Sequence, residues 1–282
     1  MPVNGNQRGS VRQLDYKQYN QLGERLQQLL ILRYSPIAMK LLYDESEIPE
    51  GSQRPVKDLG GHLSMCQAYA MVRRERKSLT LLKEDHWCVW PLVGYGMVEL
   101  DDEDVTYMGS KLFFAEPEKG VAFLRDVYPR LKAERKPLGF TIAPLETANY
   151  VPELICVYCR PAQLRSIMMA VRFQTGEMLE LKLDSVDSCV HSSIPVLNGQ
   201  DYNITIPDPG EYERGLTDED EMMFTMRADR LEGLVAVLER LSRAGMGYRQ
   251  LALGLQFDTP RPVFYNKMFE KWGLETGEVW KK

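Results

Sequence analysis

The chain has 282 residues, with 35 basic and 40 acidic side chains and a formal net charge of −5 at pH 7. Hydrophobic residues make up 44% and charged residues 27%, which is typical of a globular protein and excludes collagen-like and low-complexity classes. A net acidic chain is a poor general binder of nucleic acid or of an anionic membrane surface. We therefore expect neither nucleic acid nor a membrane as a partner.

The cellular location can be predicted from apolar runs and from cysteine usage. No run of uncharged apolar residues reaches the roughly 18 that a membrane helix needs, because residues 29–32 are followed by Arg33 and Pro36. The first residues lack the apolar stretch of a secretory signal. We expect a cytoplasmic protein whose five cysteines stay reduced, since disulfides are rare in that compartment.

The predicted helices follow from capping residues and apolar spacing. Residues 1–14 are polar, and we expect a loose N-terminal segment there. Asp15 can cap the first helix, with Gln18 at the capping-box position. Apolar residues at helical spacing predict further helices. These cover residues 63–75, a stretch from about Glu118, residues 161–176 and residues 229–244.

The predicted strands are short apolar or alternating runs. They cover residues 37–43, 79–83, 139–145, 154–159, 178–184, 202–206 and 221–227. Leucines alternate most regularly with charged residues in 178–184. Strands and helices follow one another without a regular βαβ order, so we expect an α+β fold with a mixed sheet and several packed helices.

One large domain over residues 15–245 accounts for most of these elements. The remaining residues, 246–282, are rich in aromatic side chains and form a C-terminal extension. Such a tail usually wraps the protein's own core, and less often it contacts a second copy in a homo-oligomer.

Several common catalytic motifs are missing from the sequence. There is no GxGxxG after a predicted strand, no GxxxxGK[ST], no HExxH and no GxSxG. The chemistry of dinucleotide-binding proteins, P-loop proteins, zincins and α/β-hydrolases therefore has no motif support.

Three of the five cysteines each have a histidine within four residues in the sequence. The pairs are His62 with Cys66, His86 with Cys88, and Cys189 with His191, and the chain has only three histidines. Cysteine and histidine are the ligands of zinc, copper and iron–sulfur clusters. The three segments are therefore candidates for one metal site. Alternatively, the thiols are ordinary core residues, because free cysteine is among the most buried residue types.

The other two cysteines, Cys156 and Cys159, form a C-x-x-C pair. In redox proteins such a pair lies at a turn into a helix, which lowers a thiol pKa, and Pro161 does begin a predicted helix here. The residues between them are typical of a strand, however. Residues three apart on a strand point to opposite faces and cannot join in a disulfide. We favour the structural interpretation.

The order of several short motifs resembles that of family 169 of the domains of unknown function, found in bacteria and archaea. The motifs lie in residues 32–40, 65–68, 79–88, 157–163, 188–207 and 218–226. The likeness covers about residues 30–240. It implies that Cys66, Cys88 and Cys189 are cysteines of the family. Many members carry a further cysteine just after a late proline, where this chain has Asp208, and Cys159 or Cys156 is a candidate substitute.

Together these observations predict an iron–sulfur protein that is an enzyme, either a lyase or an oxidoreductase. Cys66, Cys88 and Cys189 would hold a [4Fe-4S] cluster, with Cys159 as a candidate fourth ligand. Three thiolates leave one iron open as a Lewis acid for a small-molecule substrate, whereas four favour electron transfer to a redox partner protein. The candidate proton donors are His62, His86 and His191. Neighbouring acidic residues, among them Asp85 and Asp184, would either orient these imidazoles or face solvent.

Two other functions remain open at this point. In the first, the protein is not catalytic, and cysteines and histidines bind a structural zinc ion. In the second, the protein binds a small molecule or a partner without metal, and Trp87, Trp90 and Tyr95 line the pocket.

Overall fold

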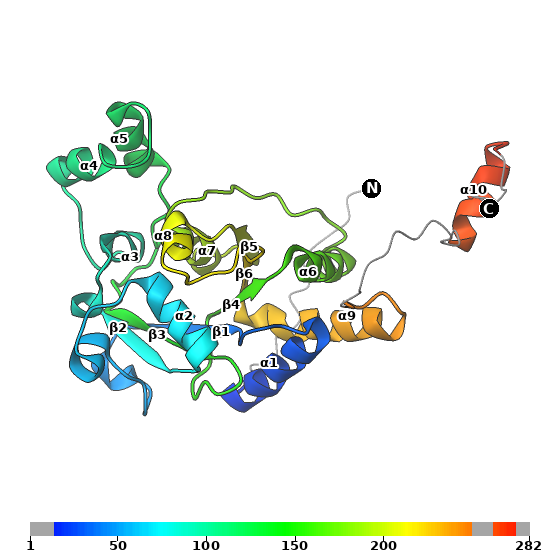
Figure 1. Ribbon diagram of the computed structural model, residues 1–282, viewed down its shortest axis with the longest axis horizontal. Helices are drawn as coiled ribbons and strands as arrows, with labels where there is room; N and C mark the ends of the chain where they lie inside the picture. Colours follow the sequence, from blue (N-terminus) through cyan, green and yellow to red (C-terminus); the bar gives the residue numbers. More distant parts are fainter. Residues whose placement is uncertain (1–13, 250–261, 275–282) are drawn as a thin grey trace. The chain divides into compact units, whose positions relative to one another are not determined.

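The computed structural model describes residues 14–249 and 262–274 (Figure 1). The chain divides into two compact units, Met1–Tyr248 and Arg249–Lys282. Among the described residues, the first unit contains all the strands and all the helices but one. In the second, the structure describes one helix, α10 (Val263–Lys271), in which the rings of Phe264 and Tyr265 are in contact. The predicted N-terminal segment and most of the aromatic extension lie outside the described residues.

A six-stranded sheet forms the centre of the first unit. Its strands are β1 (Ile37–Leu42), β2 (Leu79–Leu82), β3 (Gly139–Pro144), β4 (Leu154–Cys159), β5 (Tyr202–Thr205) and β6 (Met222–Arg227). They lie in the order β2-β3-β1-β4-β6-β5, and every neighbouring pair is antiparallel. The α+β class is confirmed, but the sheet is antiparallel where we expected a mixed one. A run of apolar residues locates a strand without fixing the direction of its neighbours.

Nine helices of the first unit surround the sheet in the described part of the chain. They are α1 (Tyr16–Leu30), α2 (Met65–Glu75), α3 (Val89–Gly94), α4 (Asp102–Gly109), α5 (Pro117–Asp126), α6 (Pro161–Thr175), α7 (Ser188–Leu197), α8 (Pro209–Glu213) and α9 (Leu231–Arg243). Shorter turns are η1 (Glu45–Glu47), η2 (Pro55–Leu59), η3 (Lys83–Asp85) and η4 (Ala228–Arg230). The predicted capping box is present, because Gln18 N donates to Asp15 Oδ1 over 2.9 Å and Asp15 N donates back over 3.0 Å.

Each face of the sheet is covered by its own set of helices. On one face α1, α6 and α9 pack together and supply Leu26, Ile167 and Leu234 to the core (Figure 1). On the other face α2, α3 and α7 supply Tyr69, Val93 and Val190. Because β4 lies between two cores, all its residues are buried. The candidate metal centre lies on the second face.

The alternating run at 178–184 was predicted as a strand, and this prediction is wrong. The segment has no regular structure in the described chain. Leu179 and Leu181 are half-buried against the first core, as the alternation requires, but Leu183 is exposed. A strand also needs a neighbouring strand for its backbone hydrogen bonds, and this segment has none.

Candidate membrane spans are helices that are both long and apolar. None of the helices in 14–249 or 262–274 is both long enough and apolar enough to cross a bilayer.

Candidate metal centre

The three cysteines of the candidate site all lie at the starts of helices. Cys66 is the second residue of α2, Cys189 is the second residue of α7, and Cys88 immediately precedes α3. Asp208 caps a fourth helix, α8, whose third residue is Glu211. These four helix starts come from distant parts of the sequence and converge on the same face of the sheet.

Electrostatic interactions join the three thiols into one cluster. A hydrogen bond with Cys66, together with burial, raises the pKa of the Cys189 thiol, and Asp208 and Cys88 add to the shift. Burial raises the pKa of Cys88 to about 11, with contributions from Asp187 and Cys66. The structure thus brings together the three cysteines that the sequence singled out. Without a metal the raised pKa values keep Cys88 and Cys189 protonated, so a metal ion that binds here must displace those protons.

Two carboxylates complete the cluster. One ligand atom each of Cys66, Asp208 and Glu211 lies within 4.8 Å of the others. The sulfur of Cys66 is 3.8 Å from Asp208 Oδ2. Ser188 Oγ lies 3.1 Å from that same oxygen and donates to Glu211 Oε1 over 2.5 Å. Tyr158 donates to the other oxygen of Glu211 over 2.8 Å, so both carboxylates are held in place.

Burial also shifts the acidity of the carboxyl groups. It raises the pKa of Glu211 to about 7 and that of Asp187 to about 7, with Asp208 adding repulsion in both cases. Carboxyl groups that bind a proton near neutral pH are concentrated at functional sites, because burial and like charge are uncommon elsewhere.

A buried arginine lies beneath the cluster. Arg73 donates to both carboxylate oxygens of Glu221, over 2.8 and 2.9 Å, and to the carbonyl of Leu216 over 2.6 Å. Its guanidinium also lies 3.9 Å from the centre of the Tyr158 ring. The charge of Arg73 is therefore balanced by Glu221, and it positions the tyrosine that binds Glu211.

Two of the three histidines are not placed to serve the thiols. His62 is exposed in the loop before α2. His86 packs against Phe140, 5.6 Å away between ring centres, and burial lowers its pKa to about 4. The expected orientation of His86 by Asp85 is wrong, because that carboxylate accepts hydrogen bonds from Arg54 and from backbone N–H groups.

The third histidine, His191, lines a cavity of about 530 Å³ and lies 3.7 Å from Asp184. The ring of Tyr128 contacts His191 at 5.7 Å, and its hydroxyl donates to Asp187 over 3.2 Å. Burial, and the proximity of Asp187, raise the pKa of the Tyr128 hydroxyl. Tyr128 therefore joins His191 of this cavity, which we call the His191 cavity, to Asp187 at the N-terminal end of α7.

The remaining cysteines lie on β4, as the structural interpretation predicted. Cys159 belongs to the core of one sheet face and Cys156 to the core of the other. Burial raises the pKa of Cys156 to about 12. Cys159, the candidate fourth ligand, lies across the sheet from Cys66, and that expectation is wrong. The C-x-x-C pair is structural.

The aromatic residues near Cys88 do not line one pocket. Tyr95 is completely buried and donates to Ser193 over 2.6 Å. Trp90 packs on Tyr128, and Trp87 is exposed beside Arg214. These residues are close in the sequence, but their side chains lie in different surroundings.

Sequence reasoning missed Ser188, Asp208 and Glu211 as members of the site. A usable signal was present for two of them. Asp208 is followed directly by Pro209, and Glu211 lies three residues after Asp208. This is the pattern of a helix N-cap with proline in the first turn. That pattern predicts a helix start close to the late cysteine, but not its position beside Cys66.

Comparisons with known proteins place the chain in a family. The model of the DUF169 family, described as uncharacterised ArCR, matches residues 25–237. The uncharacterized protein MJ0308 of Methanocaldococcus jannaschii is 21% identical over 229 residues, which are 80% of this chain and 96% of that protein. No solved structure matches. The family match covers most of the chain, including the three cysteines and the two carboxylates of the candidate centre. The chain therefore belongs to the DUF169 family.

Proposed function

We propose that the protein is an iron–sulfur enzyme in which Cys66, Cys88 and Cys189 hold the cluster. The observation that carries this proposal is the electrostatic interaction among these three thiols, which lie at the starts of α2, α3 and α7. Thiolates from separate loops are the usual ligands of such clusters. A lyase or an oxidoreductase acting on a small molecule is the activity that we propose, in the reducing interior of the cell.

The donor set suits an iron–sulfur cluster in two ways. Three sulfur ligands are soft donors, and soft donors favour iron–sulfur clusters and zinc over magnesium or calcium. The thiolates and the cluster together carry negative charge. The positive ends of the α2 and α7 dipoles point to Cys66 and Cys189 and stabilise that charge.

Asp208 is the residue of greatest interest at the remaining position. It stands where the family resemblance implies a cysteine in many members, and its carboxylate lies 3.8 Å from the sulfur of Cys66. An oxygen ligand is weaker for iron than a thiolate and exchanges more readily. We infer that Asp208 would lie at the coordination position that the three thiolates leave open.

The chemistry available at this centre depends on the cluster and on its surroundings. When bound, a cluster with three thiolate ligands supplies a Lewis-acidic iron or a site for one electron. The protein itself holds Asp208 and Glu211 through Ser188 and Tyr158. The His191 cavity, which His191, Phe123 and Asp184 help to line, is the space that we assign to the substrate.

Anaerobic metal analysis tests the proposal. The full chain, purified without oxygen and supplied with iron and sulfide, should bind both and absorb broadly in the visible range. Cys66→Ser, Cys88→Ser and Cys189→Ser should each lose at least half of the iron. Cys156→Ser and Cys159→Ser are matched controls and should keep it. Equal iron content in all five variants, or a colourless wild-type protein, would overturn the assignment.

A zinc centre is a second candidate, and the close spacing of three ligand atoms favours it. Cys66, Asp208 and Glu211 offer ligand atoms within 4.8 Å of one another, which suits a small ion with mixed sulfur and oxygen ligands. Histidines take no part in this version, in contrast to the zinc site expected from the sequence. Stoichiometric zinc in colourless protein, lost in Glu211→Gln but kept in Cys88→Ser, would support it over the cluster.

A further inference from the structure

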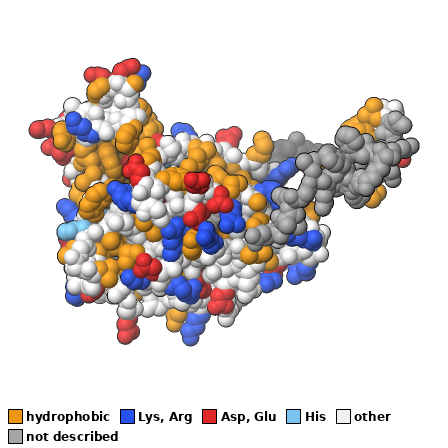
Figure 2. Space-filling model, viewed as in Figure 1, with side chains coloured by type: hydrophobic (Ala, Val, Ile, Leu, Met, Phe, Trp, Pro, Cys, Tyr) orange, Lys and Arg blue, Asp and Glu red, His pale blue; other side chains and the backbone are white. Residues whose placement is uncertain are grey.

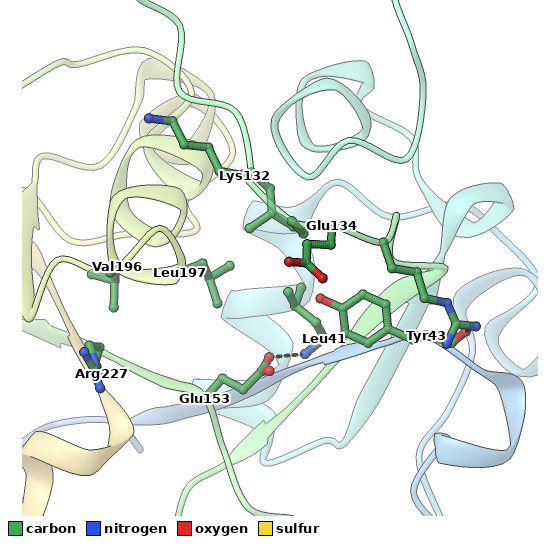
Figure 3. Close-up of a pocket in the computed structure, with 12 residues that line it drawn as sticks. Leu41, Tyr43, Lys132, Glu134, Glu153, Val196, Leu197 and Arg227 are labelled. Carbon is green, nitrogen blue, oxygen red and sulfur yellow. Dashed lines mark hydrogen bonds between the residues drawn. The ribbon is translucent and has the colours of Figure 1, made fainter.

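A second cavity, of about 570 Å³, lies at the other end of α7 (Figure 3). Val196 and Leu197 from the last turn of α7 form part of its wall, and Leu41 at the end of β1 lies opposite. Seven residues separate Cys189 from Val196, which is about 10 Å along a helix axis. This cavity, which we call the Glu153 cavity, is thus separate from the thiol cluster.

Two carboxylates and a hydroxyl face one another across the Glu153 cavity. In Figure 3 the oxygens of Glu134 and Glu153 and the hydroxyl of Tyr43 point towards the same space. Glu153 Oε2 accepts a hydrogen bond from Leu41 N over 2.7 Å, which fixes the carboxylate and leaves its other oxygen open. No ion pair joins Glu134 or Glu153 to a cation in the part of the chain that the structure describes.

The cations in the cavity wall are directed elsewhere. Arg227 bonds to Asp229 over 2.5 Å and lies 3.7 Å from Asp201. The side chain of Lys132 extends away from both carboxylates (Figure 3). The charged groups labelled in Figure 3 that face the cavity are therefore the two carboxylates.

Arg135, the third cation of the wall, is engaged with Tyr43. It donates to the carbonyl of that residue over 2.6 Å and lies 5.7 Å from the centre of its ring. Its guanidinium is thus held beside Tyr43.

The surrounding fold strengthens this negative character. The C-terminal end of α7, which carries a partial negative charge, borders the cavity. Burial raises the pKa of Glu153, and Glu47 raises it further, while the backbone of Leu41 and Lys40 act in the opposite direction. A nearby cation favours the charged form of a carboxylate, so a cation bound in the cavity would stabilise charged Glu153.

We propose that the Glu153 cavity binds a small aliphatic amine. Its ammonium group lies between Glu134 and Glu153, where it donates hydrogen bonds to the two carboxylates and to the hydroxyl of Tyr43. Its methylene groups lie against the apolar wall formed by Leu41, Val196 and Leu197. The cavity volume of about 570 Å³ is within the range of natural small-molecule sites.

Calorimetric titration of the full chain tests this proposal with defined probes. Ethanolamine, 1,4-diaminobutane and 1,5-diaminopentane represent the amines, 1,5-pentanediol is the uncharged analogue, and glutarate is the anionic one. At least one amine should bind ten times more tightly than the diol and glutarate. Glu153→Gln and Glu134→Gln should each weaken amine binding at least tenfold. Glutamine keeps the acceptor for Leu41 N, so Glu153→Gln should retain the wild-type melting temperature.

Two controls make the result specific. Glu103→Gln removes an exposed carboxylate from α4 and should leave binding unchanged. Cys66→Ser should also leave it unchanged, because the thiols lie at the other end of α7. Absence of binding by all three amines, equal binding of the diol, preference for glutarate, or unchanged binding in both cavity variants would overturn the proposal. Loss of binding in Cys66→Ser would overturn the separation of the two sites.

Discussion

Arg73 forms a bidentate ion pair with Glu221, and both side chains are buried. The pair joins α2 to the residue that precedes β6. Removing one member leaves the other charged and buried, which typically costs about 3–5 kcal/mol. We expect Arg73→Ala to lower the free energy of unfolding by about that amount, measured by urea denaturation. The control is Arg25→Ala, whose pair with Glu239 is largely exposed, and its loss should stay below about 1 kcal/mol.

The same pair makes stability depend on pH. Burial alone would raise the pKa of Glu221, but the hydrogen bonds and charge of Arg73 outweigh it and hold the pKa below its usual value of 4.5. A group whose pKa is lower in the folded state stabilises the fold above its unfolded pKa, and this contribution is lost as the pH falls through the folded pKa.

We therefore expect the unfolding free energy to decline as the pH drops below about 4.5, and the decline to be shallower in Glu221→Gln than in the wild-type protein. Urea denaturation at a series of pH values between neutral and acidic conditions measures it. Parallel curves for the two proteins would contradict the assignment.

Much of the fold could be predicted because local signals agree with it. The capping box at Asp15 and the continuous apolar run of β4 are examples, and both elements appear at the predicted places. The alternating run at 178–184 failed because pairing with a second strand is not a local property. The sequence also carries no signal for strand order, which depends on how helices pack on both faces.

The candidate centre was predictable to a lesser extent. The three cysteines could be selected because of their residue type, but their convergence depends on the paths of α2, α3 and α7. The histidines were misleading, because closeness in sequence does not fix direction: His191 is two residues from Cys189 yet packs with Phe123 and Tyr128. Asp208 and Glu211 were missed because their pattern predicts a helix start but does not place that start beside Cys66.

The α4–α5 hairpin depends on two glycines in contact. A Cβ atom on Gly120 would lie 2.1 Å from the carbonyl oxygen of Gly109, which is backbone and cannot move aside cheaply. We expect Gly120→Ala to destabilise the hairpin by about 1–3 kcal/mol, visible as faster amide exchange in α4 and α5. Gly61→Ala is the control, since a Cβ there meets nothing within 4 Å. Unchanged exchange in both variants would contradict the close contact.

Oxidation of the metal-free chain distinguishes the two groups of cysteines. The thiols of Cys66 and Cys189 interact directly, whereas Cys156 and Cys159 face opposite sides of β4. Treatment with diamide followed by peptide mass spectrometry should yield a Cys66–Cys189 crosslink. No crosslink between Cys156 and Cys159 should form in folded protein, since their sulfur atoms cannot approach each other. The reverse pattern would contradict the placement of β4.

The convergence of helix starts has a consequence for the durability of the candidate centre. The favourable field at Cys66 and Cys189 comes from peptide groups of α2 and α7, not from lysine or arginine side chains. Peptide dipoles do not titrate, and almost any amino acid preserves them. The environment of the centre is therefore inherited with the backbone trace, so that sequences can diverge widely around the sulfur ligands while the polarity that they experience stays the same.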